Sequence, residues 1–181
     1  MNEFEFCIIA SGLDPESEDF EQRFYDAGCD DATISFQRGC IIVDFTREAR
    51  SIDHAIVSAV RDVEAAGARV ERIEPDPLVS LSDIAARTGM SRAAMTQYSR
   101  GQRGSDFPAP VARVTSDSPL WDWAAVAKWL FQNNKISRET AIEAAAFRAA
   151  NAAIEARQTR LQQVLQKSMR SCEKSLRKKA A

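Results

Sequence analysis

The chain is poor in the residues that build disulfide frameworks, zinc sites and flexible linkers. Its 181 residues include 4 Cys, 1 His, 7 Gly and 6 Pro. The cysteines are scattered without a Cys-x-x-Cys pair, so the sequence encodes neither a zinc site nor a disulfide framework. With 45% hydrophobic and 28% charged residues, the composition is typical of a folded protein and excludes wholesale disorder.

Long hydrophobic runs and a basic leader are absent as well. No stretch approaches about 18 uninterrupted apolar residues, and residues 1–5 are acidic where a signal peptide would be basic. We therefore expect a cytoplasmic protein without a membrane partner. The single histidine, His54, follows Asp53 and has no nucleophile beside it in a recognisable catalytic arrangement. Since a glycine-rich phosphate loop and a metal cluster are also missing, the sequence predicts no cofactor and no enzymatic activity.

Acidic and basic residues are unevenly distributed along the chain. Residues 1–77 hold 7 basic and 18 acidic side chains, a net charge of −11. Residues 78–134 have a net charge of +2, and residues 135–181 have a net charge of +7. Basic side chains attract nucleic-acid phosphates, whereas carboxylates repel them. Only the second half of the chain is therefore expected to meet a polyanion.

Strand and helix patterns follow one another in residues 1–76 in the order βαββαβ. The expected strands cover residues 3–10, 32–36, 40–46 and 69–73, and the expected helices cover residues 19–29 and 51–66. Gln37, Arg38 and Gly39 form the predicted hairpin turn between the second and third strands. This order predicts a ferredoxin-like domain, and with it an α+β protein. Because the fold hosts many functions and the domain is acidic, we interpret it as an assembly or sensing module.

The strand patterns also predict an apolar patch on the sheet face that the two helices leave open. The side chains expected beneath the helices are Phe4, Phe6, Ile8, Ile41, Val43 and Phe45. The side chains expected on the open face are Cys7, Ile9, Cys40 and Ile42. Contiguous apolar patches rarely stay in water. We expect this one to be covered by a second copy of the domain, by another part of the chain, by a protein partner or by a small apolar ligand.

Two short helices separated by a tight turn follow a proline-rich boundary at residues 75–77. Ser82 is expected to cap the first helix, which runs to about Thr88. Ser91 is expected to cap the second helix, which ends at Gly101. Four residues have the spacing and size that a helix-turn-helix needs, and these are Ala85, Gly89, Met95 and Tyr98.

Residues 107–122 add the pattern of a wing. Phe107-Pro108 leads into a strand over residues 111–115, a polar turn over residues 116–119, a strand at Leu120-Trp121 and a helix capped by Asp122. From Leu81 to Leu130 the segment resembles the winged DNA-binding domain of the mercury-resistance regulator (MerR) and excisionase superfamily. The resemblance covers about 50 residues and implies a DNA-binding domain over residues 77–134. Such domains usually stand first in their proteins, whereas some 77 residues precede this one, so no effector or metal is implied.

The second helix of this motif carries residue types that read base edges in the major groove. The side chains opposite its buried face are Arg92, Ala93, Thr96, Gln97 and Arg100. Arginine pairs with guanine, glutamine pairs with adenine, and small or methyl-bearing side chains contact thymine. The residues expected to hold DNA phosphates are Arg87, Arg103, Arg113, Thr115 and Ser116. The three tryptophans are expected to anchor the core of this domain.

Residues 135–181 predict one long helix, because the stretch 137–179 contains neither glycine nor proline. Apolar side chains recur there at heptad spacing, which is typical of a dimerising coiled coil. The expected seam comprises Phe147, Ile154, Leu161 and Leu165. A helix that folds back on its own protein and a partly frayed tail are the alternatives.

These features favour a sequence-specific regulator of transcription that binds double-stranded DNA as a homodimer on paired half-sites. One alternative is a phage or plasmid accessory factor that uses the winged domain to bend DNA. The other is a protein-interaction adaptor that binds no DNA.

Overall fold

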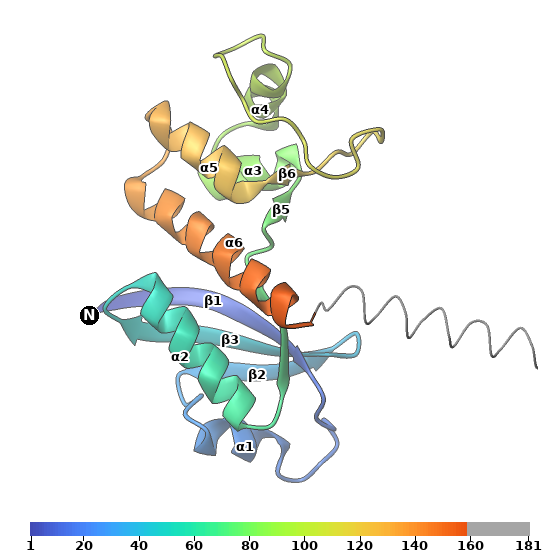
Figure 1. The fold of residues 1–181 in the computed structure, drawn as a ribbon, viewed down its shortest axis with the longest axis vertical. Helices are drawn as coiled ribbons and strands as arrows, with labels where there is room; N and C mark the ends of the chain where they lie inside the picture. The colour runs from blue at the N-terminus through green and yellow to red at the C-terminus, as the bar shows by residue number, and fades with distance from the viewer. Residues whose placement is uncertain (159–181) are drawn as a thin grey trace, which may run out of the picture.

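A computed structural model describes residues 1–158, which form a mixed α+β structure with two hydrophobic cores. Figure 1 shows an N-terminal unit built on a sheet, a second unit of short helices, and the helix α6 passing between them. Within residues 1–158, no helix is long and apolar enough to cross a membrane.

The N-terminal unit has the predicted order of strands and helices. Its elements are β1 (Asn2–Ser11), α1 (Phe20–Asp26), β2 (Ala32–Gln37), β3 (Cys40–Ala49), α2 (Ile52–Ala65) and β4 (Arg69–Glu74). The strands form an antiparallel sheet in the order β2-β3-β1-β4. The first and third strands are therefore the central pair, as expected, and β2 and β4 are the two edges.

Alternation along the central strands places their large apolar side chains beneath the helices. Phe6 and Ile8 of β1 and Val43 and Phe45 of β3 are buried in the first core together with residues of α1 and α2. Phe6 and Phe45 stack with ring centroids 5.5 Å apart. The prediction of which strand residues face the helices is thus confirmed.

A buried arginine ties this core together, and the sequence patterns gave no sign of it. Arg47 of β3 is 6% exposed and forms salt bridges of 2.7 Å to Asp31 and 2.8 Å to Asp62. It also donates to the carbonyl oxygen of Gly28. Burial by itself would lower the pKa of Arg47, but the hydrogen bonds and charges of the two carboxylates outweigh it and raise the pKa. The guanidinium is therefore held in its charged form.

The second unit consists of β5 (Leu78–Val79), α3 (Leu81–Thr88), α4 (Arg92–Ser99), β6 (Trp121–Asp122) and α5 (Trp123–Gln132). The cap of α3 differs from the expectation. Ser80, not Ser82, is the N-cap, since its side chain accepts from the Asp83 amide while the Asp83 carboxylate accepts from the Ser80 amide. This reciprocal pair starts α3 at Leu81. The predicted caps Ser91 and Asp122 are confirmed, because each accepts a hydrogen bond from the backbone three residues on.

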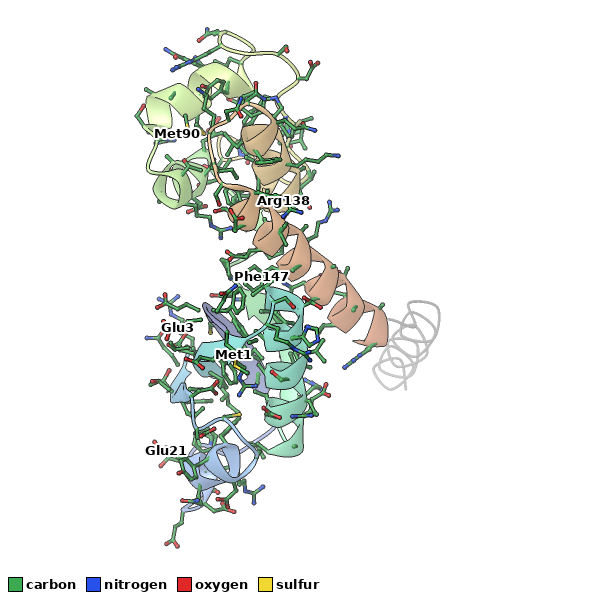
Figure 2. All side chains as sticks on the ribbon, turned by 90° about the vertical axis from the view of Figure 1, so that its left-hand side faces the viewer. Met1, Glu3, Glu21, Met90, Arg138 and Phe147 are labelled. Atoms are coloured by element: carbon green, nitrogen blue, oxygen red, sulfur yellow. The ribbon has the colours of Figure 1, made fainter. Side chains whose placement is uncertain are left out.

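The helix α6 (Arg138–Gln158) contributes side chains to both cores. Ala144 is buried in the second core, whereas Phe147 and Ile154 are buried in the first. Figure 2 shows Phe147 where the helix meets the N-terminal unit. Between these two residues, Asn151 is 7% exposed and bonds to the edge strand β4. Its Oδ1 accepts from the Ile73 amide at 2.8 Å, and its Nδ2 donates to the Ile73 carbonyl at 2.9 Å. The side-chain amide thus takes the place of a neighbouring strand.

This packing bears on the expected seam of the C-terminal segment and on what could cover the open sheet face. Phe147 and Ile154 are buried within their own chain, so they do not form an intermolecular seam in this structure. The helix folds back, as one of the alternatives proposed, and it lies beside α2 and β4. It shares the core with the helix-facing side chains, so it does not cover the opposite sheet face.

Candidate nucleic-acid interface

The helix α4 exposes most of the row of side chains that the sequence assigned to base contacts. Arg92, Ala93, Gln97 and Arg100 are exposed. Thr96 is partly buried, and its hydroxyl donates to the Arg92 carbonyl oxygen at 3.0 Å. The helix itself contains no acidic residue. One face of α4 is therefore polar, basic and accessible.

The opposite face of α4 fixes the helix on its unit. Met95 and Tyr98 are 0% and 4% exposed and pack in the second core with Ile84 and Ala85 of α3. Gly89 supplies the turn between the helices with φ of 67°. That left-handed conformation costs a glycine little, whereas it strains most other residues. The spacing that predicted the helix-turn-helix therefore corresponds to observed contacts.

An aromatic cluster holds the loop that follows α4. The Trp129 ring meets Tyr98 and Phe107 edge-on, with centroids 5.1 and 5.0 Å away. The indole of Trp129 also donates to the Ser105 carbonyl at 2.8 Å. Arg103 lies in this loop with its guanidinium carbon 5.2 Å from the centre of the Tyr98 ring. The cation of Arg103 is thereby placed next to the end of α4.

The three tryptophans are core anchors, as predicted. Trp121, Trp123 and Trp129 are 4%, 4% and 6% exposed. The indole of Trp121 donates to the Pro108 carbonyl at 3.0 Å. This bond holds the proline-rich segment that precedes the loop closed by Ala112 and Leu120. None of these rings is available as a platform for a base.

The expected wing is reduced to a loop closed by a single bridge. Ala112 pairs with Leu120, whereas β6 pairs with β5 and not with residues 111–115. The predicted strand over residues 111–115 is therefore wrong in extent. Arg113 has φ of 50°, which lies outside the strand region, and Pro119 cannot donate to a ladder. Arg113, Thr115 and Ser116 are exposed on this loop.

Four arginines of this surface lack a carboxylate partner within residues 1–158, whereas most arginines of the N-terminal unit have one. In the part of the chain that the structure describes, Arg92, Arg100, Arg103 and Arg113 form no salt bridge. The salt-bridged arginines of the N-terminal unit are Arg23, Arg47, Arg61, Arg69 and Arg72. The arginines around α4 are thus left with charge that no carboxylate of the described chain neutralises.

Arg87 contacts its own chain and does not face solvent freely, as a residue that binds a phosphate would. Its Nη2 donates to the Asp76 carbonyl at 3.0 Å, and its guanidinium carbon lies 5.3 Å from the centre of the Trp123 ring. Burial lowers the pKa of Arg87, and its Nη1 is buried without a hydrogen-bond partner. These contacts place Arg87 between α3 and the segment that enters the unit. A role in DNA binding stays a prediction.

The other residues assigned from the sequence lie away from α4. Cys7, Cys40 and Ile42 are partly buried and Ile9 is 8% exposed, on the sheet face opposite the helices. Burial, with the charges of Asp44 and Glu74, raises the pKa of Cys7 to about 12. That this face is an interface stays a prediction. Leu161 and Leu165 of the predicted seam lie outside the described residues.

His54 lies beside a serine and an aspartate, but in a geometry unlike a catalytic triad. Its Nδ1 is 2.8 Å from the Ser51 hydroxyl and 3.4 Å from an Asp53 carboxylate oxygen. A triad needs the two partners on different ring nitrogens, and here both meet the same one. Among residues 1–158, no group of histidine, cysteine, aspartate and glutamate side chains could hold a metal ion.

No protein-family model matches the chain, and no curated protein or solved structure is significantly similar to it. The residues and their geometry are therefore the only basis for assigning a function.

Proposed function

We propose that the chain binds double-stranded DNA sequence-specifically, with α4 in the major groove, and regulates transcription as a homodimer. The observation that carries the proposal is the row of mostly exposed side chains on α4, a helix that contains no acidic residue. Arg92 and Arg100 in this row have no carboxylate partner in residues 1–158. A helix that is anchored by one face and offers arginine and glutamine on the other suits base readout.

The individual roles follow from the donors and acceptors of the side chains. Arg92 and Arg100 would donate to guanine, and Gln97 would pair with adenine. The methyl groups of Ala93 and Thr96 would lie near thymine. Contacts to phosphates would come from Arg103 next to α4 and from the three loop residues Arg113, Thr115 and Ser116.

The rest of the molecule is compatible with this role. The strand order β2-β3-β1-β4 with two intervening helices supports our assignment of a ferredoxin-like domain. The loop closed by Ala112 and Leu120 would act as a short wing in a winged helix-turn-helix unit. The net charge of −11 over residues 1–77 repels DNA, so the N-terminal unit would serve assembly or sensing.

Selection of bound sequences from a random duplex library, with the full chain, tests this proposal. Arg92→Ala and Gln97→Ala should each lose about 1 to 3 kcal/mol of preference for the selected base. Arg113→Ala should weaken binding to all duplexes about equally. Lys128→Ala, an exposed cation on α5, is the matched control and should leave affinity and preference unchanged. Equal losses on selected and scrambled DNA for Arg92→Ala and Gln97→Ala would contradict the groove assignment.

Two exposed apolar side chains favour a protein-binding adaptor as the second candidate. Val111 and Val114 are 58% and 62% exposed on or beside the loop closed by Ala112 and Leu120. Apolar side chains in such a place suit a protein partner better than a phosphate backbone. Titration of duplex DNA at rising salt separates the two candidates. Affinity that falls steeply with salt supports DNA binding, and absence of binding at low salt supports the adaptor.

A further inference from the structure

The two edges of the N-terminal sheet are treated differently by the fold. The amide of Asn151 bonds to both backbone groups of Ile73 and so blocks the β4 edge at that residue, where α6 lies beside the strand. At the other edge, no strand of residues 1–158 pairs with the outer side of β2. Unpaired strand edges invite pairing with another chain, and proteins protect them with charges, prolines or bulges. The strand β2 (Ala32–Gln37) contains no charged residue and no proline, and its pairing with β3 has no irregularity.

The direction of the free backbone groups on β2 follows from the hairpin. The Asp31 carbonyl accepts from the Thr46 amide at 3.0 Å, so this residue points its backbone groups toward β3. Backbone groups alternate along an antiparallel strand. Thr33 and Ser35 therefore also bond to β3, whereas Ile34 and Phe36 direct their amides and carbonyls outward. The Ala32 carbonyl points outward as well.

We propose that β2 pairs with the β2 strand of a second copy of this chain, antiparallel, with Ile34 opposite the partner's Ile34. This register keeps the helix-facing sides of both sheets on the same side of one continuous sheet. Ile34 then exchanges hydrogen bonds with the partner's Ile34, and the Phe36 amide donates to the carbonyl of the partner's Ala32. The proposal does not depend on DNA binding.

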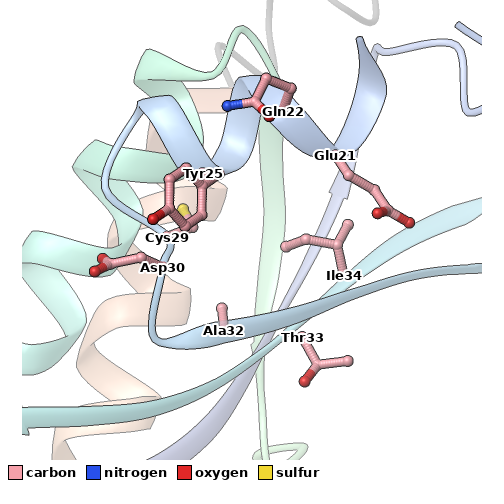
Figure 3. A pocket seen from close by; sticks show the side chains of 8 residues that line it. All are labelled: Glu21, Gln22, Tyr25, Cys29, Asp30, Ala32, Thr33 and Ile34. Atoms are coloured by element: carbon pink, nitrogen blue, oxygen red, sulfur yellow. The ribbon is translucent and has the colours of Figure 1, made fainter. Parts of the chain in front are cut away.

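The side chains fit this register. Phe36 is 47% exposed although it lies on the helix-facing side, opposite Ile41 of β3. In the dimer it lies opposite the small side chain of the partner's Ala32. There a hollow of about 480 Å³ opens between α1 and β2, lined by Glu21, Tyr25, Asp30 and Ala32 among others. Figure 3 shows Ala32 and Ile34 directed toward α1 and Thr33 directed to the other face. The partner's Phe36 ring would fill this hollow beside Tyr25.

The charged residues at the two ends of β2 favour a second copy of this chain as the partner. Beyond the two ends of β2, the same register brings Asp30, in the turn before the strand, near the partner's Arg38, in the hairpin turn, and by symmetry Arg38 near the partner's Asp30. Both side chains are exposed, and within the described part of the chain neither forms a salt bridge. Between them the strand is neutral. The edge is therefore complementary to itself, with an uncharged centre and opposite charges at its two ends.

Charge reversal in the full chain tests the pairing. Arg38→Asp should raise the dimer dissociation constant about tenfold, because it turns two attractions between the chains into repulsions. Asp30→Arg should do the same, and the double variant should recover dimerisation. Position 38 has φ of 54°, a conformation that aspartate adopts readily, so the fold should tolerate the change. A mixture of the two single variants should form heterodimers in preference to either homodimer. Arg50→Asp, another exposed arginine, is the matched control.

Hydrogen exchange locates the contact independently of charge. Raising the protein concentration should slow exchange of the Ile34 and Phe36 amides and leave the already bonded Thr33 and Ser35 amides unchanged. A monomer at all concentrations, or a dimer indifferent to both charge reversals, would overturn the proposal. So would a dimer that is lost only when residues 159–181 are removed, since it would be held by that segment.

Discussion

Replacing Asn151 by leucine should destabilise the protein by about 1 to 5 kcal/mol, because two buried backbone groups lose their partners. Leucine resembles asparagine in size and suits a helix, but it leaves the amide and carbonyl of Ile73 without partners. A buried backbone group that loses its partner costs about 1 to 3 kcal/mol, and Ile73 is 0% exposed. The apolar side chain recovers about 1 kcal/mol of this by leaving water. The net loss is a large share of the ~5 to 15 kcal/mol that holds a domain folded.

Urea unfolding followed by circular dichroism measures this loss. Ala149→Leu adds the same side chain on the exposed side of α6 and should change the free energy of unfolding by less than about 0.5 kcal/mol. Asn151→Asp keeps the acceptor and the size but loses the donor to the Ile73 carbonyl, so it should also destabilise. If Asn151→Leu unfolds at the same urea concentration as the parent chain, then the side-chain amide does not block the β4 edge at Ile73.

Three further outcomes are expected. Ser80→Ala should destabilise the second unit by about 1 kcal/mol while Ser82→Ala leaves it nearly unchanged, and equal effects in urea unfolding would mean that the α3 cap is misassigned. Asp62→Asn removes a carboxylate from the buried Arg47 and should cost about 3 kcal/mol, so a variant as stable as the parent would show that the ion pair contributes nothing. Burial and neighbouring carboxylates raise the pKa of Cys7 to about 12, so its alkylation rate should rise about tenfold per pH unit from pH 8 to pH 11. A plateau below pH 10, measured by mass spectrometry, would show that this thiol is not buried as described.

The order of elements in the N-terminal unit could be predicted because each pattern there is local. Phe6 and Ile8 recur at every second position of β1 and so lie on one face of the sheet. Arg38-Gly39 has the turn chemistry of a two-residue hairpin. The Arg47 network could not be predicted. Its carboxylates come from Asp31, before β2, and Asp62, on α2, and no spacing rule relates three residues so far apart. Long-range ion pairs depend on the fold that they stabilise.

At the candidate site, too, local spacing predicted some features, whereas others depended on distant parts of the fold. Met95 and Tyr98 lie one turn apart on a helix, so helical spacing alone determined which residues of α4 would be exposed. The extent of the wing depended instead on the backbone of Arg113 and on which strand Leu120 and its neighbours would meet. Ser82 lies two residues after Ser80 and is also a good N-cap residue, so residue type alone does not separate the two serines. The acidic residue three positions after Ser80 was the signal that distinguishes them.

The helix α6 shows that heptad spacing predicts a buried row of apolar side chains but does not indicate what that row packs against. Phe147 and Ile154 are seven residues apart, which is compatible with a seam between two chains and with a seam against the same chain. Asn151 lies on the same side between them, and in a coiled coil a buried asparagine at such a place would specify the register of two helices. Here Asn151 bonds instead to the backbone amide and carbonyl of Ile73. A strand edge offers that pair of groups and a helix interior does not, because helical amides and carbonyls bond within the helix. The asparagine therefore pins α6 to the β4 edge, and the β2 edge is left as the place where the sheet can grow.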